Sequence, residues 1–169
     1  MNMNIIIIII LIILCIIITT YNIIDKFINK WEDTIDGIVY INLDNREDRK
    51  NLLLKELEKI NIDMDKVNKV SGSYIPNNGH KGCVQSHIIA LTMAKLNRWN
   101  NVLIFEDDME LDVSPDVFNS NINNMLEYLN KNNISWDVIM LGVCHTDDPT
   151  WKKDLNNNLV KITKATCGH

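Results

Sequence analysis

The sequence predicts an α/β fold with a mainly parallel sheet, because short apolar runs alternate with helical segments along the chain. Three mainly apolar runs have the length of buried strands, residues 37–43, 102–105 and 136–142, and residues 67–70 are predicted to be a further short strand. Residues 102–105 are apolar throughout, and the two longer runs each contain one polar side chain, Asn42 and Asp137, instead of alternating with polar residues. That pattern is typical of parallel strands that helices cover on both faces.

Helical segments fill the intervals between these strands. The first follows residue 43, is capped by Asp44 or Asn45, and has an apolar face at intervals of three or four residues, formed by Leu53, Leu54, Leu57 and Ile60. The second spans residues 83–96 and carries one apolar stripe, formed by Val84, Ile88 and Leu91. A third covers residues 117–129. A strand followed by a capped amphipathic helix is the usual opening of an α/β unit.

Charge is distributed unevenly along the 169 residues, since the 17 basic and 22 acidic side chains all lie after residue 24. The net charge is −5 and the chain has only three arginines, Arg46, Arg49 and Arg98. A nucleic-acid surface needs a basic stripe that displaces counterions, so we exclude nucleic acid as a partner. The composition also excludes collagen-like and disordered chains.

Residues 1–24 are predicted to be a transmembrane anchor. Residues 5–18 are all apolar, and the uncharged stretch up to residue 24 is about as long as a helix that spans a bilayer. A cleaved signal peptide is one alternative, but a basic start and a small-residue cleavage site are both missing. A buried strand or helix is the other. The expected location is a membrane, with a single-pass anchor that contacts the bilayer through residues 5–24.

The anchor is followed by a predicted juxtamembrane helix or linker, residues 25–36, and by a predicted soluble domain, residues 37–169. Lys26 and Lys30 give a weak preference for a cytoplasmic domain, which leaves the side of the membrane open.

Three carboxylates, Glu106, Asp107 and Asp108, directly follow the strand predicted at residues 102–105. In open α/β sheets, ligands bind outside the carboxyl ends of the strands. Adjacent carboxylates repel one another unless a positive charge lies among them, and a divalent cation such as Mn²⁺ or Mg²⁺ supplies that charge. If the backbone stays extended, Glu106 and Asp108 point to the same side and Asp107 to the other. A solvated acidic loop is the alternative.

Four blocks of the sequence resemble, in order and spacing, those of glycosyltransferase family 25: residues 40–49 (YINLDNREDR), 82–87 (GCVQSH), 103–108 (LIFEDD) and 136–142 (WDVIMLG). That family includes lipopolysaccharide-type glycosyltransferases and procollagen galactosyltransferases. The resemblance covers about residues 37–169. It implies a GT-A type nucleotide-sugar-binding domain that moves a hexose from a UDP-sugar to an acceptor hydroxyl.

The resemblance also implies a Mn²⁺ ion, or Mg²⁺ in its place, at the acidic motif. We expect Glu106 and Asp108 to be the metal ligands, with Asp108 the preferred direct ligand. A metal that bridges carboxylates and phosphates neutralises the charge that develops on the leaving diphosphate. The donor-binding residues are expected at the ends of the predicted strands and on the helices that flank them: Asn42, Leu43, Asp44, Arg46, Arg49, Ser86, His87 and Asp107.

Some of these residues have simpler interpretations. Arg46 and Arg49 either reach phosphate or pair with neighbouring carboxylates on a solvated helix face. His87 either orients the sugar or phosphate or lies in the core with the apolar stripe of its helix. We exclude a nucleophilic pair of Ser86 and His87, because adjacent helical residues point about 100° apart.

An inverting transfer, which the resemblance implies, requires a carboxylate that deprotonates the acceptor hydroxyl. Asp147 and Asp148 are the late candidates for this catalytic role, with a plain turn as the alternative. The acceptor is expected to be a glycan, a lipopolysaccharide or a collagen-like protein. The C-terminal acceptor half of the domain is expected to be missing, so a catalytically incomplete remnant that only binds nucleotide-sugar is the alternative function.

Two other functions compete with the transferase. Histidine and cysteine side chains could assemble a zinc site, although no CxxC pair anchors it: His80, Cys83, His87, Cys144, His145, Cys167 and His169. A phosphohydrolase of the haloacid-dehalogenase type would need a DxD nucleophile on the first strand, where this chain has Asn42-Leu43-Asp44.

Overall fold

The computed structural model describes residues 9–20, 31–141, 152–156 and 159–162. The chain divides into two compact units, Met1–Asn123 and Asn124–His169. The first unit contains a parallel sheet, and the second contains a pair of antiparallel strands.

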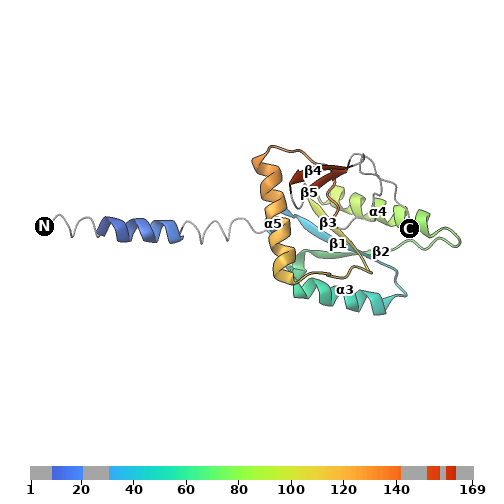
Figure 1. The fold of residues 1–169 in the computed structure, drawn as a ribbon. Coiled ribbons are helices and arrows are strands. Elements are labelled where there is room, and N and C mark those ends of the chain that lie inside the picture. Colours follow the sequence, from blue (N-terminus) through green and yellow to red (C-terminus); the bar gives the residue numbers. More distant parts are fainter. Residues whose placement is uncertain (1–8, 21–30, 142–151, 157–158, 163–169) are drawn as a thin grey trace. The chain divides into compact units, whose positions relative to one another are not determined.

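A three-stranded parallel sheet forms the centre of the first unit (Figure 1). Its strands are β1 (Gly37–Asn42), β2 (Val67–Ser71) and β3 (Val102–Glu106), in the order β2-β1-β3. All six residues of β1 are buried, as expected for a central strand that is covered on both faces. The predicted α/β class, the parallel sheet and these three strands are confirmed.

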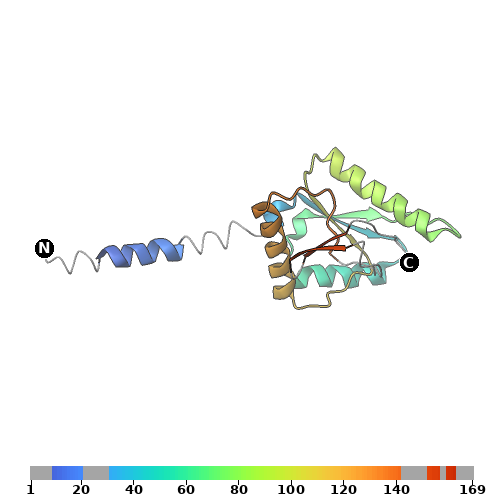
Figure 2. The same cartoon turned by 45° about the horizontal axis from the view of Figure 1, so that its top comes forward.

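Two helices connect the strands and lie on opposite faces of the sheet (Figures 1 and 2). α3 (Glu47–Lys59) leads from β1 to β2 through the short 3₁₀ turn η1 (Met64–Lys66), and α4 (Gly79–Leu96) leads from β2 to β3. Because β2 and β3 lie on opposite sides of β1, the two connections run in opposite directions. Right-handed crossovers then place their helices on opposite faces.

α3 packs on the sheet as predicted but begins differently. Leu53 and Leu57 are fully buried, which confirms the predicted apolar face. The N-cap residue is Arg46, with no side-chain capping bond, so the predicted cap at Asp44 or Asn45 is wrong. Asp44 is unsuited to that role because its carboxylate instead accepts hydrogen bonds from β2.

α4 is found where a helix was predicted, but its buried face is a different one. The predicted apolar stripe is exposed to solvent: Val84, Ile88 and Leu91. The face that packs against the sheet consists of small residues, Gly82, Ser86, Ala90 and Ala94. Small side chains allow the helix backbone to approach closely, and a Cβ atom at Gly82 would overlap the carbonyl oxygen of Ser73.

One apolar cluster forms the core on the α4 face of the sheet. Its buried members are Val39, Ile41, Val70 and Ala90, and the partly buried residues packed against it are Met93, Trp99, Val102 and Ile104. Trp99 lies directly against the start of β1, where Gly37 leaves room for the indole ring. The middle strand is thereby fixed between α3 and α4.

Part of the segment predicted as a linker belongs to the folded unit. α2 (Trp31–Thr34) buries Trp31, whose side chain is only 2% exposed. The indole Nε1–H donates to the Oδ1 atom of Asn119 over 2.8 Å, and the ring meets Phe118 edge-on with centroids 6.2 Å apart. Both partners lie on α5 (Pro115–Lys131), the helix predicted at residues 117–129.

The second unit contains the end of α5 and the antiparallel strands β4 (Lys152–Asn156) and β5 (Leu159–Ile162). The Tyr128 hydroxyl donates to the carbonyl oxygen of Leu155 over 2.7 Å, which ties the helix to β4.

The strand predicted at residues 136–142 is wrong for its described part, because residues 136–141 form no strand. A strand needs a neighbour for its backbone groups, and among the described residues β3 pairs only with β1. Most apolar side chains of this run are exposed: Trp136, Val138, Met140 and Leu141.

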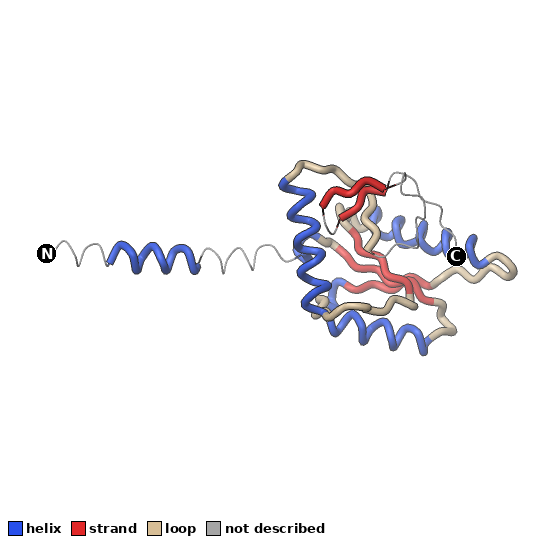
Figure 3. Tube along the Cα trace, viewed as in Figure 1, coloured by secondary structure: helices blue, strands red, loops and turns tan. Residues whose placement is uncertain are grey.

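Residues 9–20, the described part of the N-terminal apolar segment, are helical (Figure 3). Among the helices the structure describes, none has both the length and the apolar character that crossing a membrane requires. This finding contradicts the predicted transmembrane anchor and the predicted single-pass membrane location.

Candidate functional site

The carboxyl ends of β1 and β3 form the topological switch point of the sheet. The two strands are neighbours, with Ile41 opposite Glu106, and the chain leaves β1 toward α3 but reaches β3 from α4. In doubly wound sheets with the order 2-1-3, ligands bind outside the ends of these two strands. The acidic motif and the turn after β1, which are far apart in sequence, therefore meet at this edge.

Asn42, the last residue of β1, connects the two strand ends. Its side chain is 1% exposed, and its Nδ2 group donates to Asp107 Oδ2 over 2.8 Å and to the carbonyl oxygen of Arg46 over 2.9 Å. Because both partners are acceptors, the orientation of the amide is fixed. Among the described residues its Oδ1 atom has no hydrogen-bond donor, although it is buried.

Arg49 places a positive charge beside two carboxylates of the acidic motif, those of Asp107 and Asp108. Its Nη1 atom lies 3.1 Å from Asp107 Oδ1 and 3.6 Å from Asp108 Oδ2. The guanidinium reaches them from α3. A divalent cation was predicted because the adjacent carboxylates need a positive charge among them. The Arg49 guanidinium supplies part of that charge.

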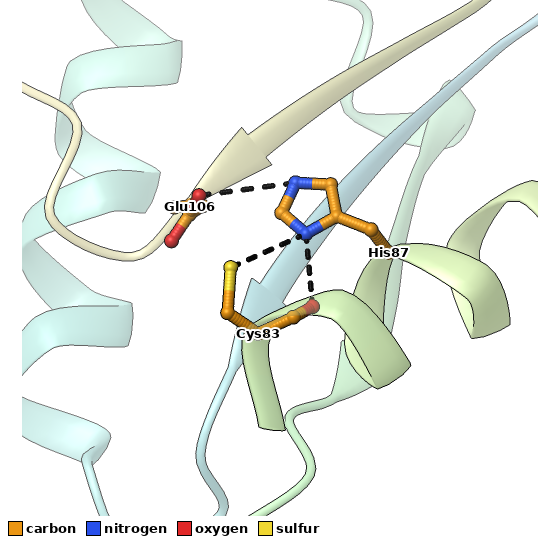
Figure 4. A group of neighbouring side chains, drawn as sticks. All are labelled: Cys83, His87 and Glu106. Atoms are coloured by element: carbon orange, nitrogen blue, oxygen red, sulfur yellow. Dashed lines mark hydrogen bonds and ion pairs between the residues drawn. The ribbon is translucent and has the colours of Figure 1, made fainter. Parts of the chain in front are cut away.

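Glu106 lies on the other side of the sheet edge, beside α4. Its Oε1 atom is 3.8 Å from His87 Nε2 (Figure 4). The predicted alternation, with Glu106 and Asp108 on one side, does not hold, because β3 ends at Glu106 and the next two residues form a turn. Asp107 and Asp108 consequently both lie near Arg49.

Cys83, His87 and Glu106 form a compact cluster, shown in Figure 4. One ligand atom from each of the three side chains lies within 4.8 Å of the other two. Among the described residues this is the one group of three or more histidine, cysteine, aspartate or glutamate side chains with such spacing. Cys83 and His87 are one turn apart on α4, and the Cys83 Sγ atom is 3.7 Å from His87 Nδ1.

His87 has a defined hydrogen-bond arrangement. Its Nδ1 atom is 3.1 Å from the carbonyl oxygen of Cys83, and a carbonyl oxygen can only accept, so Nδ1 carries a proton. Its side chain is 38% exposed, so the interpretation of His87 as a core histidine is wrong.

Ser86 fastens the loop after β2 to α4. Its hydroxyl accepts from the Ser73 N–H and donates to the Gly82 carbonyl oxygen, both over 2.8 Å. The hydroxyl proton is therefore directed at Gly82 and not at His87, in agreement with the exclusion of a Ser–His nucleophile.

The turn after β1 is organised by one ion pair and several hydrogen bonds. Asp44 accepts from Lys69 Nζ over 2.6 Å and from the Ser71 hydroxyl over 2.9 Å, and the hydrogen bond from Lys69 is the main cause that lowers the pKa of Asp44. Leu43 contributes its carbonyl oxygen, which accepts from the Arg46 N–H. These contacts hold the loop between β1 and α3 against β2.

Arg46 pairs with Asp48 within the first turn of α3. The Nη2 to Oδ2 distance is 2.7 Å, and the hydrogen bond from Arg46 is the main cause that lowers the pKa of Asp48 to about 2. Arg46 therefore pairs with Asp48 at the start of α3, and Arg49 pairs with the acidic turn, while contact of either arginine with phosphate stays a prediction.

The predicted catalytic carboxylates, Asp147 and Asp148, lie outside the described residues. So do four members of the zinc alternative: Cys144, His145, Cys167 and His169. The meeting of Cys83 and His87 with Glu106 was not predicted from the sequence. The signal was the spacing of four residues between the cysteine and the histidine, which places both on one helix face.

Comparisons with models of protein families, with curated proteins and with solved structures found no match to this chain.

Proposed function

We propose that the carboxyl edge of β1 and β3 binds a nucleotide-sugar, and that the chain is the donor-binding part of a hexosyltransferase. Support comes from the four sequence blocks that resemble glycosyltransferase family 25, three of which contribute to one edge of the sheet. The observation that carries the proposal is the hydrogen bond from Asn42 to Asp107, which joins the first and third blocks at the switch point.

Transfer breaks the bond between the anomeric carbon and the diphosphate oxygen and forms a bond from that carbon to the acceptor oxygen. The hydroxyl proton passes to a carboxylate, for which Asp147 and Asp148 stay the predicted bases. In the proposed site, Arg49 approaches the diphosphate from α3. Its side chain is 39% exposed and can reach a ligand while it neutralises the acidic turn.

The described residues fit a Mn²⁺ or Mg²⁺ ion only in part. Such an ion prefers a set of oxygen ligands, whereas Glu106 lies beside a thiol and an imidazole. Asp107 and Asp108, the other oxygen donors, lie near Arg49. The proposed donor site therefore includes no step through Mn²⁺ or Mg²⁺, and both ions stay predictions.

Titration of the purified chain with UDP by calorimetry tests the proposed donor site, with parallel runs in chelator, Mn²⁺ and Mg²⁺. We expect UDP to bind in at least one condition, and Arg49→Gln to weaken binding about tenfold or more, since a charge-assisted contact is lost. Lys55→Gln is the matched control, because it removes one positive charge from an exposed position of the same helix. Absence of UDP binding in all conditions, or equal affinity of Arg49→Gln and the wild type, would contradict the proposal.

The predicted metal ligand is tested separately. If Asp108 holds the cation, Asp108→Asn removes the metal dependence of UDP binding, whereas Asp112→Asn, at an exposed position after the acidic turn, leaves it intact. Release of sugar from a UDP-hexose, or its transfer to an added acceptor, then distinguishes an enzyme from a remnant that only binds.

A further inference from the structure

We infer that Cys83, His87 and Glu106 form a binding site for a borderline transition-metal ion of the Zn²⁺ class. This site differs in ligands and in metal class from the oxygen-liganded cation that the family resemblance implies. It shares one residue, Glu106, with the predicted acidic metal site. Its existence does not depend on nucleotide-sugar binding.

The spacing of the three ligand atoms is close to that of a zinc site. Zinc binds sulfur at about 2.3 Å and nitrogen or oxygen at about 2.0–2.2 Å, so ligands at tetrahedral angles are about 3.4–3.7 Å apart. The observed distance from His87 Nε2 to Glu106 Oε1 is 3.8 Å, and all three ligand atoms lie within 4.8 Å of one another. α4 holds Cys83 and His87 one turn apart, with Cys83 Sγ 3.7 Å from the Nδ1 atom of the His87 ring, so the three donor groups lie close to coordination spacing.

The orientation of the His87 ring also favours a cation beside Glu106. The hydrogen bond between Nδ1–H and the Cys83 carbonyl oxygen leaves Nε2 as the ring atom that faces the Glu106 carboxylate. A positive charge between Nε2 and the carboxylate is favourable: a proton on Nε2 gives an ion pair, and a bound metal ion replaces that proton. A histidine with Nδ1–H bound to a backbone carbonyl and Nε2 directed at the cation is the common arrangement in protein metal sites.

The donor atoms of the cluster determine the class of metal. A thiolate and an imidazole favour Zn²⁺, Co²⁺ or related ions, and disfavour Mg²⁺ and Ca²⁺, which take oxygen ligands. The side chains of His87 and Glu106 are 38% and 53% exposed, so the cluster is open to solvent. Three protein ligands with a fourth position open to water or a ligand oxygen are typical of catalytic zinc sites and not of closed structural ones.

Cobalt substitution tests the inference with a signal that requires sulfur. We expect one Co²⁺ per chain to produce a sulfur-to-cobalt charge-transfer band in the near ultraviolet, and Zn²⁺ to abolish it by displacement. Cys83→Ser should remove the band, and His87→Gln or Glu106→Gln should weaken Zn²⁺ affinity about tenfold or more, as measured by chelator competition. Circular dichroism verifies that each variant is folded.

His80→Gln is the matched histidine control, because His80 is on α4 but outside the cluster, and Cys15→Ser is the cysteine control. Both should bind Co²⁺ as the wild type does. A band that persists in Cys83→Ser, or that disappears in Cys144→Ser or Cys167→Ser, would overturn the inference, as would displacement of Co²⁺ by equimolar Mg²⁺. Because these titrations contain no nucleotide, their failure is distinguishable from failure of the UDP experiments.

Discussion

Asn42 donates a hydrogen bond to Asp107 over 2.8 Å and thereby joins the ends of β1 and β3, at positions 65 residues apart in the chain. The same amide group donates to the carbonyl oxygen of Arg46, immediately before α3. One buried side chain thus fixes both the turn that begins α3 and the acidic turn after β3.

Asn42→Ala should lower the free energy of unfolding by about 1–3 kcal/mol, because Asp107 and the Arg46 carbonyl lose a donor in a poorly solvated place. Urea denaturation followed by circular dichroism measures the change. Asn45→Ala, at an exposed position of the same turn, is the control and should alter stability by no more than about 0.5 kcal/mol. Equal stability of the two variants would show that the Asn42 contacts do not stabilise the fold.

Two glycines of α4 should respond oppositely to alanine. Gly82→Ala places a Cβ atom against the Ser73 carbonyl oxygen and should destabilise the protein by about 1–3 kcal/mol. Gly79→Ala, at the start of the same helix, meets no atom within 4 Å and should be neutral or stabilising by up to about 1 kcal/mol. Thermal denaturation of both variants checks the contrast, and a stable Gly82→Ala protein would disprove the close approach of α4 to the loop.

The ion pair between Arg46 and Asp48 predicts a pH dependence. The pKa of Asp48 is lowered from 3.8 to about 2 in the folded protein, so the pair stabilises the fold above about pH 4 and loses this effect as the pH falls toward 2. Arg46→Gln should return the pKa of Asp48 toward 3.8, which a carboxyl-carbon NMR titration measures. Lys55→Gln should leave it unchanged. An unaltered pKa in Arg46→Gln would exclude Arg46 as the cause.

Trp31 offers a test of whether α2 belongs to the folded unit. Trp31→Ala should lower the free energy of unfolding by about 3–5 kcal/mol through loss of a buried ring. Trp31→Phe retains most of the ring but leaves Asn119 Oδ1 without its donor, and should lower it by about 1–3 kcal/mol. If urea denaturation finds Trp31→Ala as stable as the wild type, α2 does not stabilise the folded unit, and the sequence-based prediction of a juxtamembrane helix or linker describes the segment better.

Local patterns predicted most elements of the first unit but not which helix face packs. The strands β1 and β3 were evident because each is a largely apolar run, whereas β2 (VNKVS) was predicted as a short strand between two helical segments. On α4, hydrophobicity singled out Val84, Ile88 and Leu91, which are exposed. The helix instead packs through Gly82 and Ala90, because close backbone approach depends on small volume and not on hydrophobicity.

The candidate site was predicted in position but not in its internal partners. A carboxylate motif that ends a buried strand lies at the sheet edge by topology alone, so Glu106 and Asp107 could be located from sequence. Glu106 lies beside His87, and Asp107 lies beside Arg49. This arrangement depends on the turn after Glu106 and on the two helices that carry the partners on opposite faces of the sheet. Neither determinant is a local property of the motif.

The strand order also bears on how the sheet assembles. Contact between Asp44 and Ser71, across β1 and β2, closes a loop of 27 residues, whereas contact between Asn42 and Asp107 closes one of 65. Because loop-closure entropy grows only logarithmically with length, the longer loop costs about 0.8 kcal/mol more. Chain length therefore favours β2 over β3 only weakly as the first strand to join β1.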